Sequence, residues 1–135
     1  MVNDLLDEFG EKIRLLRDPT RGGLGTVLNE IANDISKGVF IKEKTIPVEK
    51  QVAAACEMLG LDPMYVANEG VFLVIIDPSV EKEVLKLMRN HAKGKNSALI
   101  GEITNEHPNK VVMESLIGGK RIVSPLVGEQ LPRIC

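Results

Sequence analysis

The sequence predicts an α+β domain with a mixed β-sheet and helices packed on it. Segments with the apolar spacing of amphipathic helices are interleaved with β-rich runs. The strand-like runs cluster toward the end of the chain and include a hairpin, which favours mixed pairing over a purely parallel sheet. The chain has 135 residues, of which 44% are hydrophobic and 27% charged, so it is long and apolar enough to fold around a core.

Two helices and a short strand are expected first. Apolar residues recur at helical spacing over 2–16, and Pro19 should close this helix because the residue before a proline avoids the helical conformation. The segment 24–35 carries the clearest apolar stripe, and Gly38 is a typical helix stop. Residues 39–42 alternate in polarity and predict a short strand.

The middle of the chain predicts another helix, a buried strand and a further helix. The first of these helices would run from Pro47 to Gly60. Its apolar face would consist of Val48, Val52, Cys56 and Leu59. The continuous apolar run 71–76 predicts a buried central strand. Ser79 is expected to cap the following helix, which Gly94 would end.

The remaining strands are expected at 98–103, 111–116 and 120–123. The last two flank Gly118 and Gly119, which predicts a hairpin. Beyond Pro125 the periodicity fades. We therefore expect residues 1–125 to form the α+β domain and residues 126–135 to form a flexible, mobile tail.

The composition excludes several classes of protein. A formal net charge of −2 gives no support to a broad nucleic-acid surface. No apolar run approaches the roughly 20 residues that span a bilayer, and the acidic N-terminus is unlike a secretory signal. Two cysteines form neither a disulfide framework nor a zinc cluster, and no metal site is recognisable. The sequence thus predicts a cytoplasmic protein with free thiols that binds neither nucleic acid nor membrane.

The first candidate site is Arg17-Asp18-Pro19-Thr20-Arg21-Gly22-Gly23, directly before the clearest helix. Glycines let backbone approach a ligand closely, and free N–H groups at a helix start favour an anion such as phosphate. Arg21 could bind phosphate oxygens, and Asp18 could cap the turn or hold a metal near them. The alternative is an ordinary turn with a helix cap, because the same residue types favour turns. The segment is not a P-loop, since no Gly-Lys-Ser/Thr follows.

Glu69 and Cys135 are the other candidates. Glu69 precedes the strand expected at 71–76, where a carboxylate could act as a base; the alternative is a solvated turn. Cys135 is the last residue, and a thiol on a tail can be loaded in one place and delivered to another, since ten extended residues reach about 33 Å. The alternative is a cysteine without a function. The position of Cys56 on an apolar helix face predicts a buried and inert thiol.

Three segments together resemble the C-terminal domain of the HypE-type hydrogenase maturation proteins. Residues 17–24, followed by Leu28-Asn29-Glu30-Ile31-Ala32, resemble their glycine-rich segment. Leu59-Gly60-Leu61-Asp62-Pro63 with Tyr65-Val66-Ala67-Asn68-Glu69-Gly70 resembles their central signature. Residues 128–135, which end in Pro-Arg-Ile-Cys, resemble their terminus. That family belongs to the superfamily of aminoimidazole ribonucleotide synthetase, selenide water dikinase and thiamine monophosphate kinase, whose α+β domain follows an ATP-binding domain.

The resemblance implies an ATP-dependent carbamoyl dehydratase. A partner carbamoyltransferase would place a carbamoyl group on the sulfur of Cys135. ATP would phosphorylate the carbamoyl oxygen, and loss of phosphate would leave a thiocyanate. Its cyanide would pass to iron in a scaffold complex of two other maturation proteins, destined for nickel–iron hydrogenase.

The resemblance also implies roles for single residues. Glu69 matches a position suited to a catalytic base that removes the nitrogen protons. The nucleotide-phosphate side would be lined by Asp18, Thr20, Arg21, Gly22 and Gly23. Mg²⁺ should accompany ATP, with its principal carboxylates in the ATP-binding domain.

The family's N-terminal ATP-binding domain is absent from the sequence, so we expect this chain to be inactive by itself, and we expect the full-length protein to be a homodimer. One alternative is a non-catalytic carrier or docking module that is carbamoylated but cannot dehydrate. Another is a selenide or thiamine-phosphate kinase, which the terminal Pro-Arg-Ile-Cys disfavours.

Overall fold

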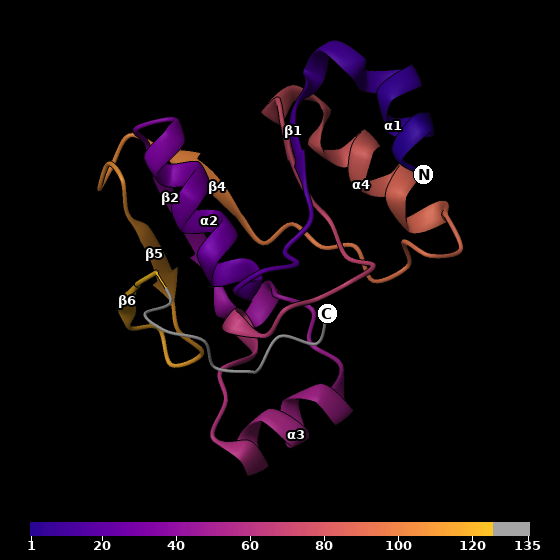
Figure 1. Cartoon of the computed structure of the whole chain (residues 1–135). Coiled ribbons are helices and arrows are strands. Elements are labelled where there is room, and N and C mark those ends of the chain that lie inside the picture. The colour runs from indigo at the N-terminus through magenta and orange to yellow at the C-terminus, as the bar shows by residue number, and fades with distance from the viewer. Residues whose placement is uncertain (126–135) are drawn as a thin grey trace. The chain divides into compact units, whose positions relative to one another are not determined.

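The computed structural model describes residues 1–125, so the expected mobile tail and Cys135 lie outside the described residues. The chain divides into two compact units (Figure 1). One unit comprises Met1–Arg17 and Phe72–Leu99, and the other comprises Asp18–Val71 and the chain from Ile100 onward. Both units combine helices with strands, which confirms the predicted α+β class.

The first unit packs two helices on a two-stranded antiparallel sheet. The elements are α1 (Val2–Phe9), β1 (Ile13–Arg17), β3 (Leu73–Ile76) and α4 (Glu81–Asn90), and β1 pairs with β3. Leu5 of α1 meets Val84 and Met88 of α4 in a small buried core. The side chains from the strand side that pack against this core are Phe72, Val74 and Ile76. The unit therefore depends on contacts between segments that lie far apart in the sequence.

Two predictions for the paired strands of this unit are wrong. The helix expected over 2–16 ends at Phe9, and the chain continues through a 3₁₀ turn (Gly10–Lys12) into β1. The apolar residues from Ile13 onward pair with β3 across the sheet, so a long-range contact overrides the local helical spacing. The run expected to form a buried central strand is instead half-buried and belongs to this two-stranded sheet.

The entry to α4 also differs from expectation. Ser79 is not the cap. The Asp77 carboxylate accepts hydrogen bonds from the Ser79 amide (3.0 Å) and the Ser79 hydroxyl (2.6 Å), and a 3₁₀ turn (Pro78–Val80) precedes the helix. The helix ends at Asn90, before the expected stop at Gly94. Asp77 thus fixes the turn between β3 and α4.

The second unit contains a four-stranded mixed sheet in the order β4-β2-β5-β6. The strands are β2 (Gly38–Lys42), β4 (Gly101–Thr104), β5 (Val111–Glu114) and β6 (Lys120–Val123). β2 and β5 are parallel, whereas the other two pairs are antiparallel, which confirms the predicted mixed pairing. The predicted hairpin between β5 and β6 also forms, closed by a hydrogen bond from the Ser115 amide to the Gly119 carbonyl (2.7 Å).

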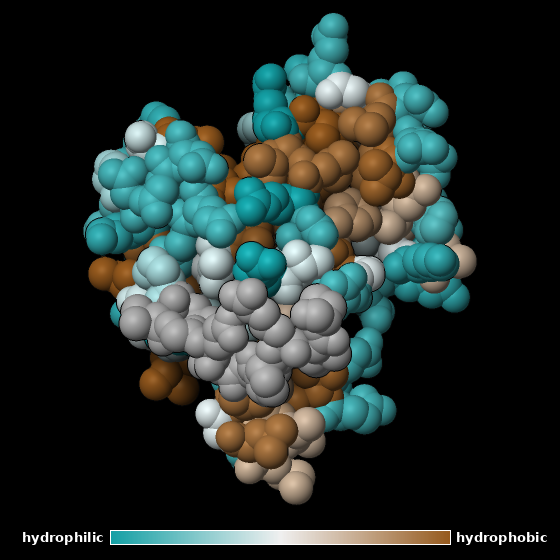
Figure 2. Space-filling model, viewed as in Figure 1, coloured by the Kyte–Doolittle hydropathy of each residue, from teal (hydrophilic) through white to brown (hydrophobic). Residues whose placement is uncertain are grey.

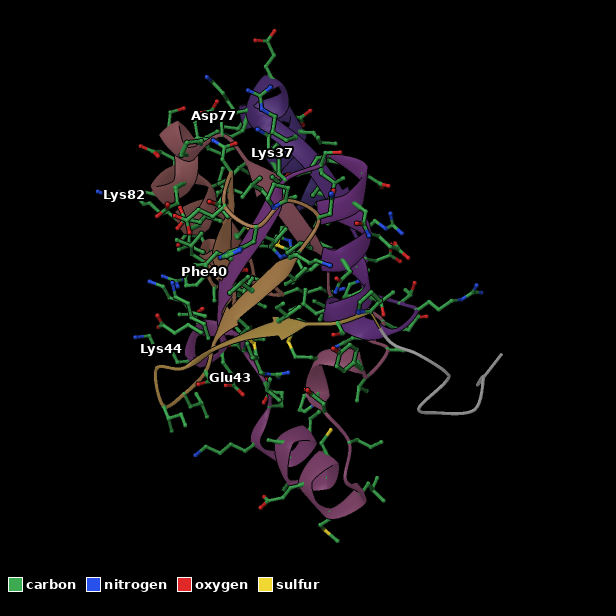
Figure 3. All side chains as sticks on the ribbon, turned by 90° about the vertical axis from the view of Figure 1, so that its left-hand side faces the viewer. Lys37, Phe40, Glu43, Lys44, Asp77 and Lys82 are labelled. Carbon is green, nitrogen blue, oxygen red and sulfur yellow. The ribbon has the colours of Figure 1, made fainter. Side chains whose placement is uncertain are left out.

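One face of this sheet is buried under α2 (Gly23–Asp34), the helix predicted most clearly from the sequence. The buried side chains of α2 are Val27, Leu28, Ile31 and Ala32, and those of the sheet are Val39, Ile41, Val111, Met113 and Val123. Phe40 of β2 alternates with Val39 and Ile41 and so lies on the opposite face of the sheet (labelled in Figure 3). The Lys120 ammonium lies 5.4 Å from the centre of its ring.

The helix α3 (Lys50–Leu59) ends at Gly60 as predicted, in the left-handed conformation with φ +66°. Its expected apolar face is not buried. Cys56 is buried, as predicted for an inert thiol, but Val48 and Val52 are exposed and Leu59 is 69% exposed. Figure 2 shows brown and tan atoms where Figure 1 places α3, so this helix presents an apolar surface.

Candidate functional site

The candidate site begins at the start of α2, where two glycines turn the chain. Gly22 and Gly23 have φ values of +68° and +63°, a region that L side chains adopt only with strain. No side chain caps this helix end. The first N–H groups of a helix have no partner within the helix, so they are available to an anion.

The same glycines admit a second segment of the chain. A 3₁₀ turn, η3 (Pro63–Tyr65), packs against the first turn of α2. A Cβ atom added at Gly23 would lie 2.6 Å from the carbonyl oxygen of Met64, and one at Gly25 would lie 2.6 Å from the ring of Tyr65. The close approach that requires glycine at 23 and 25 is therefore made by this chain's own residues.

The loops that flank these contacts are hydrogen-bonded neighbours. The amide of Asn68 donates to the carbonyl oxygen of Pro19, at 3.1 Å. Pro19 is buried and Thr20 half-buried, whereas Asp18 and Arg21 are exposed. The structure thus brings together the first candidate segment and the loop that carries Glu69.

Glu69 itself is exposed. β3 begins at Leu73, so Glu69 belongs to a loop and does not stand at the entrance of a buried strand, as the sequence had suggested. Its assignment as a base stays a prediction, as do the roles of Asp18, Thr20, Arg21, Gly22 and Gly23. Cys135 lies outside the described residues.

A buried hydroxyl lies beside the glycine turn. The Oγ1 atom of Thr26 has no hydrogen-bond partner within the described part of the chain. A Cβ atom at Gly22 would meet this Oγ1, so the hydroxyl stands directly against the turn. The uncapped N–H groups and the exposed Arg21 are donors of the kind that bind phosphate oxygens, whereas the Thr26 hydroxyl is buried behind the turn.

Three side chains that the sequence analysis did not assign to the site hold the end of β6 beside η3. The Tyr65 hydroxyl donates to the Ser124 carbonyl oxygen at 2.7 Å. The buried Asn29 side chain donates to the carbonyl oxygens of Gly25 (2.8 Å) and Val123 (2.9 Å). Asp62 pairs with Arg121 at 3.3 Å. These contacts link residues 121–124 to α2 and η3.

The surroundings of Tyr65 shift the pKa of its hydroxyl. Burial raises the pKa of the Tyr65 hydroxyl above its ordinary value, and the negative charge of Asp62 raises it further, while Arg121 opposes both. The carboxylate of Asp62 also accepts a hydrogen bond from the amide of Met64, at 2.9 Å. Burial and Asp62 thus favour the protonated phenol, so Tyr65 keeps the proton that it donates to Ser124.

The other surface features lie apart from these residues. A pocket of about 210 Å³ opens on the face of the sheet opposite α2, around Phe40, Glu102 and His107, and no predicted site residue lines it. Among residues 1–125, no group of three His, Cys, Asp or Glu side chains is arranged to hold a metal ion. Within the same range, no helix is long and apolar enough to cross a membrane.

Comparison with known proteins identifies the class. Residues 1–114 match the family described as "AIR synthase related protein, C-terminal domain", and the chain belongs to this family. It is 50% identical to the carbamoyl dehydratase HypE of Bradyrhizobium diazoefficiens, over 100% of this chain and 39% of that protein. The predicted resemblance to the HypE-type proteins is thereby confirmed.

Solved structures agree with the fold. A crystal structure of hydrogenase maturation protein HypE superposes with a TM-score of 0.91 at 41% identity, over 99% of this chain and 44% of that one. A HypE structure in complex with ATP gives 0.85 at 42% identity, over 92% and 38%. A HypE–HypF complex gives 0.85 at 36% identity, over 91% and 39%. The chain spans about two fifths of the length of the curated relatives that it matches from end to end.

Proposed function

We propose that this chain supplies the C-terminal part of an ATP-dependent carbamoyl dehydratase, with Cys135 as the residue that carries the substrate. The observation that supports this most directly is the hydrogen bond between Asn68 and Pro19, which joins the two loops that match the family's motifs. The high identity to a carbamoyl dehydratase over the whole chain supports the same reaction.

The proposed reaction removes the elements of water from a carbamoyl group on sulfur. The carbamoyl oxygen is a poor leaving group until it is phosphorylated, and the C–O bond then breaks to release phosphate. Both protons leave the nitrogen as the C≡N bond forms, so the S-carbamoyl group becomes a thiocyanate. A base near the nitrogen assists this step, and Glu69 is our candidate because it is a carboxylate in the loop bonded to Pro19.

Phosphate recognition is proposed for the start of α2. The uncapped N–H groups, with Gly22 and Gly23, would face phosphate oxygens. Arg21 would add a charged donor, and Thr20 and Asp18 would border the same loop. Gly23 is also needed for the packing of η3, because the Met64 carbonyl occupies the space that a side chain would need.

Cofactors and partners follow from the relatives. A HypE protein has been crystallised with ATP, so we propose ATP with Mg²⁺ for the complete enzyme. Another forms a complex with HypF, which supports docking to a carbamoyltransferase maturation protein. Delivery to an iron-carrying scaffold of two other maturation proteins, a homodimer at full length, and a cytoplasmic location complete the proposal.

The dehydration step is tested by joining this chain to an ATP-binding domain from a HypE relative. Cys135 is carbamoylated with the transferase, carbamoyl phosphate and ATP, and the same ATP then serves the dehydration. We expect the intact mass to fall by one water, and Glu69→Gln to load normally but keep that water. Glu57→Gln, which neutralises an exposed glutamate on α3, should behave as the parent does. Normal dehydration by Glu69→Gln would remove Glu69 from the mechanism, and loading without dehydration in the parent would favour a carrier module.

A further inference from the structure

We infer that the exposed apolar face of α3 is the surface on which the ATP-binding domain of a full-length protein docks. This α3 face consists of Val48, just before the helix, and of Val52, Ala55, Met58 and Leu59 within it. The inference rests on the proposed function, because it takes the start of α2 to share a nucleotide with that domain.

The α3 face is continuous and open to solvent. Its four residues other than Met58 recur at intervals of four, three and four positions, which places them along one side of the helix. Met58 and Leu59 are 87% and 69% exposed, and Val52 and Val48 are 43% and 41% exposed. Among the ten residues of α3, all of which the structure describes, only Cys56 is buried. The helix thus turns most of its apolar stripe outward (Figure 2).

The α3 face has the composition of a buried surface. An isolated helix shorter than about 12–15 residues is marginal in water, so a helix of ten residues depends on the surfaces that it packs against. Within the described chain, α3 packs mainly against η3, which leaves the α3 face open. The five side chains of this face carry no charge, whereas a helix face that stays in water is usually charged or polar. A covering partner would therefore stabilise the helix.

The position of α3 identifies the partner. The helix leads through Gly60 into η3, which packs against the first turn of α2 (Figure 1). The carbonyl oxygen of Met64 in η3 fills the space beside Gly23, where the proposed phosphate site begins. A domain that supplies the rest of the nucleotide site must approach this end of α2, to which the α3 face is joined through η3.

The size of the face favours a linked domain over a second copy of this chain. A stable complex between separate proteins usually buries about 800 Å² on each partner. One face of a helix over residues 48–59 is only about 17 Å long, which supplies part of that area. A linked domain needs less area, because the linker holds it at a roughly millimolar effective concentration. This chain covers 39% of the HypE protein of Bradyrhizobium diazoefficiens, so the rest of that protein is large enough to cover the face.

Thiol labelling measures whether the α3 face is covered. Met58→Cys is introduced into the 135-residue chain, and into the same chain joined to the ATP-binding domain of a HypE relative, both with Cys135→Ala. Cys56 is buried, and the modified residue is identified by peptide mass. We expect the joined domain to slow maleimide labelling of Met58→Cys by about tenfold or more, because a covered thiol reacts only when the interface opens.

Two matched controls lie on the turn between β5 and β6. Ile117 is 95% exposed, and labelling of Ile117→Cys should change by less than about twofold on joining. Leu59→Lys in the joined protein should restore fast labelling of Met58→Cys, because an unpaired ammonium resists burial. Leu116→Lys should leave that labelling slow, although Leu116 is 71% exposed and Leu59 is 69% exposed before joining.

Equal labelling rates of Met58→Cys in the separate and joined chains would overturn the inference, as would an equal slowing of Ile117→Cys. Labelling that is slow in the separate chain, and slows further as the protein concentration rises, would assign the face to a second copy and also overturn it. ATP binding by the joined protein confirms that the added domain is folded.

Dehydration of carbamoylated Cys135, measured by mass in the joined protein without these substitutions, separates the inference from the proposed function. A covered α3 face without dehydration would keep the docking surface and reject the reaction. Dehydration with an uncovered α3 face would do the reverse.

Discussion

Replacing Gly23 by alanine tests whether the close approach of η3 to α2 stabilises the fold. Gly23 and Gly60 have nearly equal φ values, +63° and +66°. A Cβ atom at Gly23 would lie 2.6 Å from the Met64 carbonyl oxygen and 2.8 Å from that of Val66, whereas at Gly60 it would meet no atom within 4 Å. The two substitutions share the backbone strain and differ in the contact.

The expected loss of stability differs accordingly. A left-handed conformation costs alanine about 1–2 kcal/mol, and the smaller entropy of its unfolded chain offsets about 0.4–1 kcal/mol. Gly60→Ala should therefore lower the free energy of unfolding by about 1 kcal/mol. Gly23→Ala also forces a contact with backbone that cannot rotate away, so its total loss should be about 2–4 kcal/mol.

Urea unfolding followed by circular dichroism gives both free energies of unfolding. The chain has one tyrosine and no tryptophan, so its intrinsic emission reports on Tyr65 beside Gly25. We expect Gly23→Ala to change this emission in the folded state and Gly60→Ala to leave it unchanged. Equal losses of stability in the two variants would refute the packing argument for Gly23.

Two further predictions concern stability. Asn29→Ala removes both hydrogen bonds of a buried side chain and should lower the free energy of unfolding by about 1–3 kcal/mol. The control Asn33→Ala, at an exposed position one turn later, should change that free energy by no more than about 0.5 kcal/mol. Equal effects of the two substitutions would contradict the buried link to Val123. Hydrogen bonds from the Ser79 hydroxyl and amide, with Lys12 and Arg14 nearby, lower the pKa of Asp77 to about 2. Ionised Asp77 therefore favours the folded state above about pH 4, and this contribution is lost as pH falls toward 2. Urea midpoints across that range should depend less on pH in Asp77→Asn than in the parent. An unchanged pH dependence in the variant would contradict this role of Asp77.

Sequence patterns predicted the second unit better than the first. The stripe over 24–35 and the Gly118-Gly119 turn are local signals, and both elements form where the pattern places them. The pattern over 2–16 fits a helix equally well before and after Gly10, and only pairing with β3 makes Ile13–Arg17 a strand. Such pairing depends on residues about 60 positions away and leaves no trace in a local window.

The site was predictable in part. The segment 17–23 was correctly placed directly before α2, but its glycines suggested a ligand where the structure also shows η3. Tyr65 and Asn29 were missed as anchors because a single tyrosine or asparagine carries no periodic signal. The dipeptide Asp-Pro, at 62–63 and at 77–78, was a usable signal for a turn. In each case the aspartate carboxylate accepts a hydrogen bond from the amide two residues on.

The most direct test of the central claim is the intact mass of this chain after incubation with the carbamoyltransferase maturation protein, carbamoyl phosphate and ATP. A full-length HypE relative, loaded in the same assay, confirms that the transferase is active. We predict a gain of one carbamoyl group in the parent chain and none in Cys135→Ala. An equal gain in Cys135→Ala, or no gain in the parent while the relative is loaded, would contradict the assignment of Cys135 as the carrier.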